Sequence, residues 1–172
     1  MAILMDNIIP SIIIGVLLTM IFRLNAFMIE TQVDNHLVSD MQQYSEMAAS
    51  IIHEELKTAN RILNMTDDSI EFEDINGFQV TIEREDDLLV VTRLDPETLA
   101  SDISTYPTYL SAIHFEPDQL GIAIDEMRFL RIRLMSESRP DAHARVNNTQ
   151  TAKAYSEKQV FLRNVATSSL QL

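Results

Sequence analysis

The chain has 172 residues, a length that accommodates one domain with its own hydrophobic core and an appended helix, but not two full domains. Its 26 acidic side chains outnumber its 13 basic ones, so the surface repels a phosphate backbone and we expect no nucleic-acid partner. The absence of cysteine excludes disulfides, zinc–thiolate sites and a cysteine nucleophile. Three glycines are too few for a glycine-rich loop that cradles phosphate.

The N-terminal segment is predicted to span a membrane. Within residues 8–22 the only polar side chains are Ser11 and Thr19. The apolar stretch reaches the roughly 20 residues that a bilayer requires when the residues on either side are included. A cleavable signal peptide is not expected, because no basic residue precedes the stretch and no small-residue cleavage site follows it. We therefore predict residues 1–29 to be the transmembrane half of a long helix.

A helical repeat of apolar residues continues beyond this segment. Apolar side chains recur at steps of three to five residues, and acidic residues such as Glu30, Asp34 and Glu46 lie on the other face. We predict residues 30–66 to be the amphipathic half of the same helix, packed on a sheet. The apolar face consists of Ile29, Val33, Leu37, Met41, Tyr44, Ala48, Ile51, Leu56, Ala59 and Ile62 or Leu63.

Residues 67–172 are predicted to form an antiparallel sheet domain. Apolar and polar residues alternate on both sides of Asn76-Gly77, a pair typical of a tight hairpin turn. Asp95 is predicted to cap a short helical or turn segment. The fold class is therefore α+β, with a long N-terminal helix packed on a small antiparallel sheet. The predicted strands lie at residues 70–72, 78–82, 88–94, 110–116, 127–137 and 159–163, with a long loop at 138–156.

Patterns of catalytic or metal-binding residues are missing from the sequence. The histidines at positions 36, 53, 114 and 143 lack the spacing of metal ligands, and no segment resembles a nucleophile elbow. We therefore expect a protein that is not an enzyme, with no cofactor, no metal site and no small-molecule substrate.

Charge is distributed unevenly along the chain. Residues 67–100 contain 11 acidic and 2 basic side chains, whereas residues 101–172 contain 8 of each. One interpretation is a solvated acidic face. A second is head-to-tail complementarity between subunits. A third, ranked last because an ordered loop motif is lacking, is calcium binding by Asp67, Asp68 and the hairpin acids. The predicted subunit contacts are the hairpin acids Glu71, Glu73 and Asp74 and the strand arginines Arg128, Arg131 and Arg133.

The order of these features resembles the type IV pilin-like proteins, including the minor pseudopilins of type II secretion systems. Four segments carry the resemblance, which covers nearly the whole chain: the hairpin and third strand SIEFEDINGFQVTIEREDDLLVVTRL, the helix-to-strand segment LASDISTYPTYLSAIHFEPD, the penultimate strand MRFLRIRLMSES and the closing strand KQVFLRNV. The resemblance implies a structural subunit held in the inner membrane by a single span, with an extracytoplasmic globular domain. It also implies helix packing with other pilin-like subunits in a surface or periplasmic filament.

The N-terminus departs from the family pattern. Members of the family carry a basic leader that is cleaved before an aromatic residue, and a glutamate at the fifth mature position; this sequence has none of these features. If Met1 were removed before Ala2, Asp6 would become the fifth residue. The resemblance then implies that its carboxylate meets the N-terminal amine of a neighbouring subunit in apolar surroundings. The alternative role for Asp6 is a helix N-cap at the membrane surface.

Two methionines are further predicted subunit contacts. Met28 and Met41 lie on the helix between the membrane segment and the sheet, where flexible thioether side chains suit an adaptable contact surface. The alternative to a filament subunit is a bitopic membrane protein whose extracytoplasmic domain acts as a scaffold or sensor without polymerising. Arg23, next to the span on the globular side, by itself favours the reverse orientation.

Overall fold

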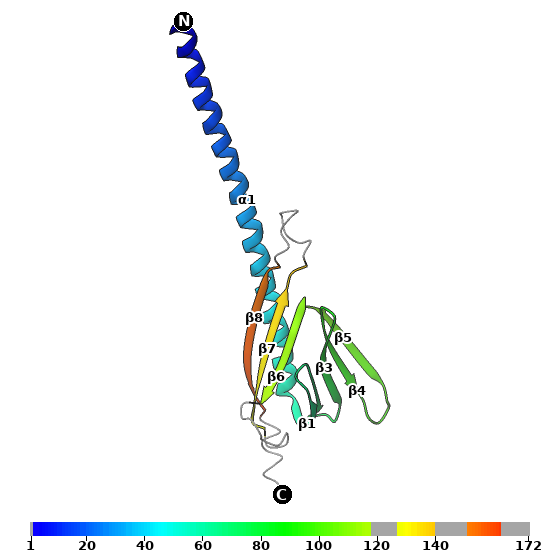
Figure 1. The fold of residues 1–172 in the computed structure, drawn as a ribbon. Coiled ribbons are helices and arrows are strands. Elements are labelled where there is room, and N and C mark those ends of the chain that lie inside the picture. The colour runs from blue at the N-terminus through cyan, green and yellow to red at the C-terminus, as the bar shows by residue number, and fades with distance from the viewer. Residues whose placement is uncertain (1, 118–126, 140–150, 163–172) are drawn as a thin grey trace.

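A long helix and a strand-rich domain make up the computed structural model, which describes residues 2–117, 127–139 and 151–162 and, in the helix, the side chains from Pro10 onward (Figure 1). The helix α1 (Ala2–Lys57) comes first. This arrangement confirms the predicted α+β class. The described strands are β1 (Ala59–Met65), β2 (Ser69–Asp74), β3 (Gln79–Glu85), β4 (Leu88–Leu94), β5 (Ser101–Pro107), β6 (Leu110–Pro117), β7 (Phe129–Glu137) and β8 (Lys153–Phe161).

The strands form two antiparallel sheets, and in each sheet the strands lie side by side in the order in which they occur in the chain. β1 to β5 make one sheet and β6 to β8 make the other. Side chains alternate between the faces of each strand, and cross-strand partners match apolar with apolar. Phe72 on β2 lies opposite Val80 on β3, and Phe115 on β6 lies opposite Ile132 on β7. Each sheet therefore has one apolar face.

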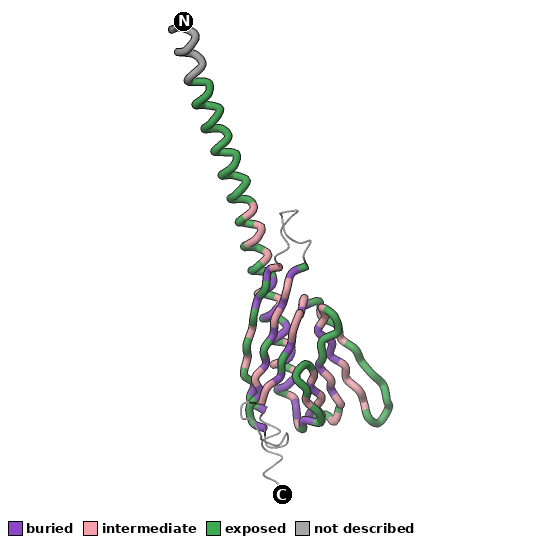
Figure 2. Tube along the Cα trace, in the orientation of Figure 1, coloured by how far each residue is buried: buried purple, intermediate pink, exposed green. Residues whose placement is uncertain are grey.

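The hydrophobic core lies where the C-terminal half of α1 meets these apolar faces (Figure 2). α1 packs chiefly against β8 and β7, and β6 contacts β2 and β3 of the other sheet. Ala48 and Ala49 allow a close approach of helix to sheet, and Ile52 and Leu56 extend the contact by two further turns. One core thus joins the helix and both sheets.

The helix ends at Lys57, so the prediction that it extends to residue 66 is wrong. The Thr58 hydroxyl donates to the carbonyl oxygen of Glu55 at 2.7 Å, which satisfies one of the last helical carbonyls. β1 begins directly afterwards and pairs with β2. Ala59 and Ile62 are buried as predicted, but from a strand. Their spacing of three fits one helical face, and β1 accommodates it because its register shifts between Ala59 and Arg61.

Other predicted elements have mixed outcomes. The strands predicted at 88–94, 110–116 and 127–137 are confirmed by β4, β6 and β7. Asp95 caps a turn, because its Oδ1 atom accepts the N–H of Glu97 at 2.9 Å. β5 was not predicted, and β8 begins at Lys153, so the predicted loop at 138–156 is wrong over its last residues. The end of the strand predicted at 159–163 lies outside the described residues.

Candidate functional site

More than half of the large apolar side chains that are exposed in the described chain lie in one segment of α1, residues 12–29. The helix is long and apolar enough to cross a membrane, and none of its most apolar stretch is buried by the rest of the chain. Every residue from 10 to 29 is exposed, so no side of this stretch is covered, and the segment is green in Figure 2. A helix that is apolar all round requires an apolar environment. The large exposed side chains are Ile12, Ile13, Ile14, Val16, Leu17, Leu18, Met20, Ile21, Phe22, Leu24, Phe27, Met28 and Ile29.

Two threonine hydroxyls of α1 are bonded within the helix and suit an apolar environment. The Thr19 hydroxyl donates to the carbonyl oxygen of Gly15, and the Thr31 hydroxyl donates to that of Phe27, each at 2.8 Å. Hydroxyls bonded within their own helix need no water. A Cβ atom built on Gly15 would meet no atom within 4 Å, so the helix surface is flat and open there. A neighbouring helix can approach closely at this point.

The three predicted contact residues of α1 have different surroundings. The side chain of Asp6 lies outside the described residues, although its backbone belongs to α1. Met28 is 51% exposed and is available for contact with another molecule. Met41 is 4% exposed and packs against Ala152 and Ala154 at the start of β8. The expectation that Met41 lies on an exposed stretch of the helix is therefore wrong, because the segment around β8 covers it; its role as a subunit contact stays a prediction.

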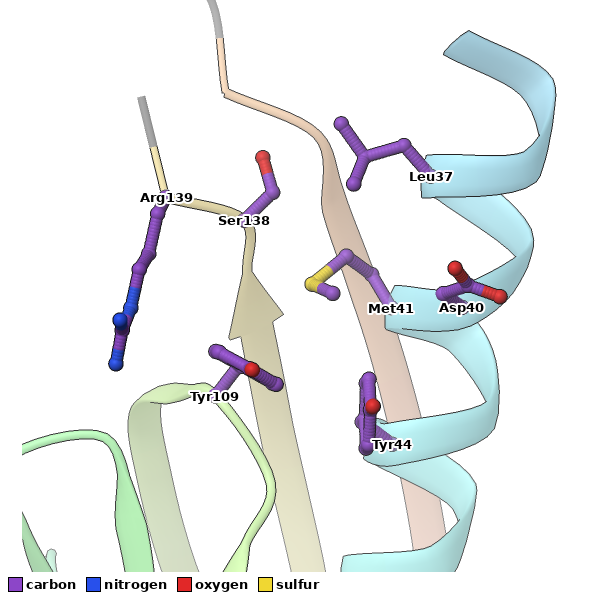
Figure 3. Close-up of a pocket in the computed structure, with 7 residues that line it drawn as sticks. All are labelled: Leu37, Asp40, Met41, Tyr44, Tyr109, Ser138 and Arg139. Carbon is purple, nitrogen blue, oxygen red and sulfur yellow. The ribbon is translucent and has the colours of Figure 1, made fainter. Parts of the chain in front are cut away.

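A pocket of about 320 Å³ lies at the junction of α1 and the sheets (Figure 3). Leu37 and Met41 form its helix wall, and Tyr44 and Tyr109 lie below them in an edge-to-face pair with ring centroids 4.9 Å apart. The carboxylate of Asp40 points away from the other lining side chains. Ser138 and Arg139 complete the lining on the side of β7.

We call this cavity the junction pocket. Two features hold the wall that the sheet domain contributes to it in place. Tyr109 has a φ of 50°, a left-handed backbone conformation that is uncommon for a bulky residue. Its carbonyl oxygen accepts the N–H of Glu137 at 2.9 Å, which holds the turn between β5 and β6 against the end of β7. Arg139 lies over the Tyr109 ring at 5.6 Å and pairs with Asp87 at 3.1 Å. The pocket therefore has apolar and aromatic walls and one cation at its rim.

The hairpin acids divide between the two faces of β2. Asp74 is 7% exposed, and its Oδ1 atom accepts the N–H groups of Asn76 at 2.8 Å and Phe78 at 2.9 Å. Gly77 supplies the positive φ of the turn, as the sequence predicted. The prediction of Asp74 as a subunit contact is wrong, because the turn uses its carboxylate internally. Glu71 and Glu73 are half-buried on the other face.

The strand arginines meet carboxylates of their own chain. Arg131 lies 3.5 Å from Glu157 on β8, and Arg133 pairs with Glu116 on β6. The hydrogen bond from Arg133 holds the pKa of Glu116 below its usual range, and the same contact raises the pKa of Arg133. Contact of these arginines with another subunit would have to compete with the internal pairs. Arg128 precedes β7, where its carbonyl oxygen accepts the N–H of Leu162.

The histidines and acids do not gather into a metal centre in the described part of the chain. His53 has a buried Nδ1 atom without a hydrogen-bond partner in these residues, and burial together with Lys57 lowers the pKa of its ring. His143 lies outside the described residues. The charges of Lys57 and Lys158 both disfavour the protonated form of the His53 ring.

Several residues of the junction pocket were not predicted from the sequence. Tyr109 carries no sequence signal, because a positive φ is not expected of a tyrosine. Arg139 lies in the segment predicted as a long loop, for which the sequence indicates no role. Burial of Met41 depends on β8, whose first residues were predicted as loop.

Comparison with protein-family models, curated proteins and solved structures finds no match for this chain.

Proposed function

We propose that this protein is a membrane-anchored, pilin-like structural subunit of an assembly of the type IV pilus or type II secretion class. The single observation that carries the proposal is the continuity of α1. One helix, from Ala2 to Lys57, has an apolar half that nothing in the described chain covers and a second half that is built into the domain core. In the subunit, the exposed half lies in the inner membrane before assembly and packs against the helices of other subunits afterwards.

The sheet domain presents the contact surface outside the membrane. Its orientation in the proposal is extracytoplasmic, as the resemblance of the sequence implies. The rigid connection between the two parts supports a mechanical role, because a helix without a break transmits the position of its membrane half directly to the domain. Arg93 on β4 pairs with Glu55 at 2.5 Å and ties the last turn of α1 to the five-stranded sheet as well.

The second candidate function is a bitopic membrane protein whose domain is a scaffold or sensor and does not polymerise. The exposed apolar half of α1 supports this candidate equally, since a single span alone needs only lipid around it. The two candidates differ in whether the helices of separate copies touch.

Cysteine crosslinking in intact membranes separates the candidates. The chain has no cysteine, so each introduced thiol reports one position. The proposal predicts disulfide-linked dimers of Met28→Cys, because Met28 lies on the exposed helix. Asn64→Cys, on exposed β1, is the control for random collision. Dimers at neither position favour the bitopic protein, and equal dimers at both positions indicate unspecific aggregation; either result would overturn the proposal.

A further inference from the structure

The turn between β4 and β5 displays a large apolar side chain in a strained conformation. Leu99 is 75% exposed, the highest exposure among the large hydrophobic side chains described, and its φ is 57°. Left-handed backbone is unfavourable for a leucine, and its exposure to water adds a second unfavourable contribution. Among the described residues Leu99 belongs to neither hydrophobic core cluster.

The turn around Leu99 is nevertheless firmly built. The N–H of Leu99 donates to the carbonyl oxygen of Asp95 at 2.8 Å, and the N–H of Asp95 donates to that of Ala100 at 2.9 Å. The Asp95 carboxylate also accepts the Thr98 hydroxyl at 2.7 Å, and these hydrogen bonds lower the pKa of Asp95. A side chain held out on an ordered turn loses little conformational entropy when it binds.

The junction pocket lies at the opposite end of the domain from this turn. In Figure 1 the connection from β4 to β5 is at the end farthest from the N-terminus, whereas β7 ends near the point where α1 leaves the domain. The walls of the junction pocket include Leu37, Met41 and the tyrosine pair (Figure 3). A volume of about 320 Å³ is ample for a leucine side chain.

One exposed residue at each end carries a charge opposite to that of the other. Glu97 is exposed on the Leu99 turn, two residues from the displayed side chain. Arg139 lies on the rim of the junction pocket, where 66% of its side chain is exposed beside Asp87. Asp40, the acid on the helix side, points away from the other lining side chains. Arg139 already pairs with Asp87, so Glu97 of a second copy would have to compete with that internal pair.

We infer that the occupant of the junction pocket is Leu99 of a second copy of this chain. The Leu99 side chain lies at one end of the domain and the junction pocket at the other. A contact between them is heterologous and head-to-tail, so further copies can be added in one direction. This inference rests on the proposed function and deepens it, because it names the surface through which the domains outside the membrane meet. It keeps Met41 as a contact, because Met41 lines the junction pocket, and it does not use Asp74.

Paired cysteines test the inference. Assembled material sheared from cells that carry Leu99→Cys/Leu37→Cys is oxidised, because copies anchored side by side in one membrane hold the turn and the pocket at different heights. The head-to-tail contact predicts a ladder of disulfide-linked multimers that is missing from each single-cysteine variant. The matched control is Ile75→Cys/Leu37→Cys, because Ile75 is another exposed apolar residue, on the turn between β2 and β3. An equal ladder from the control pair would overturn the inference.

Crosslinking of Met28→Cys in parallel separates the inference from the proposed function. Met28 dimers without a Leu99/Leu37 ladder overturn the inference and leave the proposed function standing. The loss of both products contradicts the proposed function itself.

A variant of the turn gives an independent readout. Leu99→Gly removes the side chain and fits the positive φ, so we expect a thermal midpoint no lower than that of the parent protein together with fewer multimers. A lower midpoint, or multimers unchanged, would contradict the role of Leu99.

Discussion

The two halves of α1 share one continuous backbone but have opposite surroundings. In the C-terminal half, small and aliphatic residues such as Ala48 and Ile52 are fully buried against the sheets. In the N-terminal half, aliphatic residues such as Ile13 and Leu17 are more than half exposed. The packed half owes its burial to its own chain, whereas the exposed half requires lipid or other helices. The comparison shows that one helix is both long and apolar enough to cross a membrane and part of the domain core.

The largest difference in stability is expected when isoleucine is replaced by alanine in each half of α1. Ile52→Ala leaves a cavity in the core and should lower the free energy of unfolding of the sheet domain by about 2–5 kcal/mol. Ile13→Ala should leave that free energy unchanged, because Ile13 makes no contribution to the core. Denaturant unfolding in detergent measures both. An equal loss from Ile13→Ala would show that the exposed half is packed in the folded monomer.

A charge placed in each half sharpens the comparison with respect to the membrane. Leu17→Arg should make insertion of the helix less favourable by about 2.5–3.5 kcal/mol. Met47→Arg, on the exposed side of the packed half, should leave insertion unchanged. Extraction of membranes at alkaline pH, followed by immunoblotting of pellet and supernatant, gives the distribution of each variant. Retention of Leu17→Arg equal to that of Met47→Arg would mean that the apolar half does not lie in the bilayer.

The hairpin acids separate a role within the domain from a role between subunits. Asp74→Ala leaves the N–H groups of Asn76 and Phe78 without their acceptor, and should lower the free energy of unfolding by about 1–3 kcal/mol. Glu73→Ala, the neighbouring change on the other face, should alter it by less than about 0.5 kcal/mol. Thermal unfolding of the purified variants checks the difference. If Asp74→Ala unfolds at the same temperature as the parent protein, the Asp74 carboxylate does not stabilise the turn and is available as a surface group.

The smallest effect is expected at the surface pair of Arg133 and Glu116, where water and salt screen the charges. The folded pKa of Glu116 lies below its ordinary value of 4.5. The contribution of the pair to stability is therefore present above about pH 4.5, and is lost as the pH falls through the folded pKa. Carboxyl titration by NMR should show the pKa of Glu116 returning upward in Arg133→Gln. A pKa that Arg133→Gln leaves unchanged would rule out the pair as its cause.

Much of the fold could be predicted because its pattern depends on neighbours in the sequence. The apolar stretch, the turn at Gly77 and the alternation in β7 each reflect a local preference of the chain. The end of α1 could not be predicted, because the apolar residues Ala59 and Ile62 fit a helical face as well as β1. β5 has few apolar residues and lies at the edge of its sheet, where the alternation is weakest.

Less of the candidate site could be predicted, because it depends on contacts between distant segments. Met28 remains an exposed residue of the helix, as the sequence suggested. Methionine and aspartate are also found on exposed contact surfaces, so residue type alone did not indicate that Met41 and Asp74 are buried. Their burial follows from the packing of β8 on Met41 and from the hydrogen bonds of Asp74 in the hairpin turn. The junction pocket joins α1, the turn before β6 and the end of β7, which are far apart in the sequence.

The mass of the particle formed by the full chain tests the central claim most directly. Membranes are solubilised in a mild detergent, and native mass spectrometry counts the chains, each of 19.6 kDa, in each particle. Assembly through α1 predicts particles that contain several chains. The fraction of such particles should fall when the sample is diluted. Particles with a single chain at every concentration, from membranes in which the protein is correctly inserted, would contradict assembly and leave a membrane-anchored domain that acts alone.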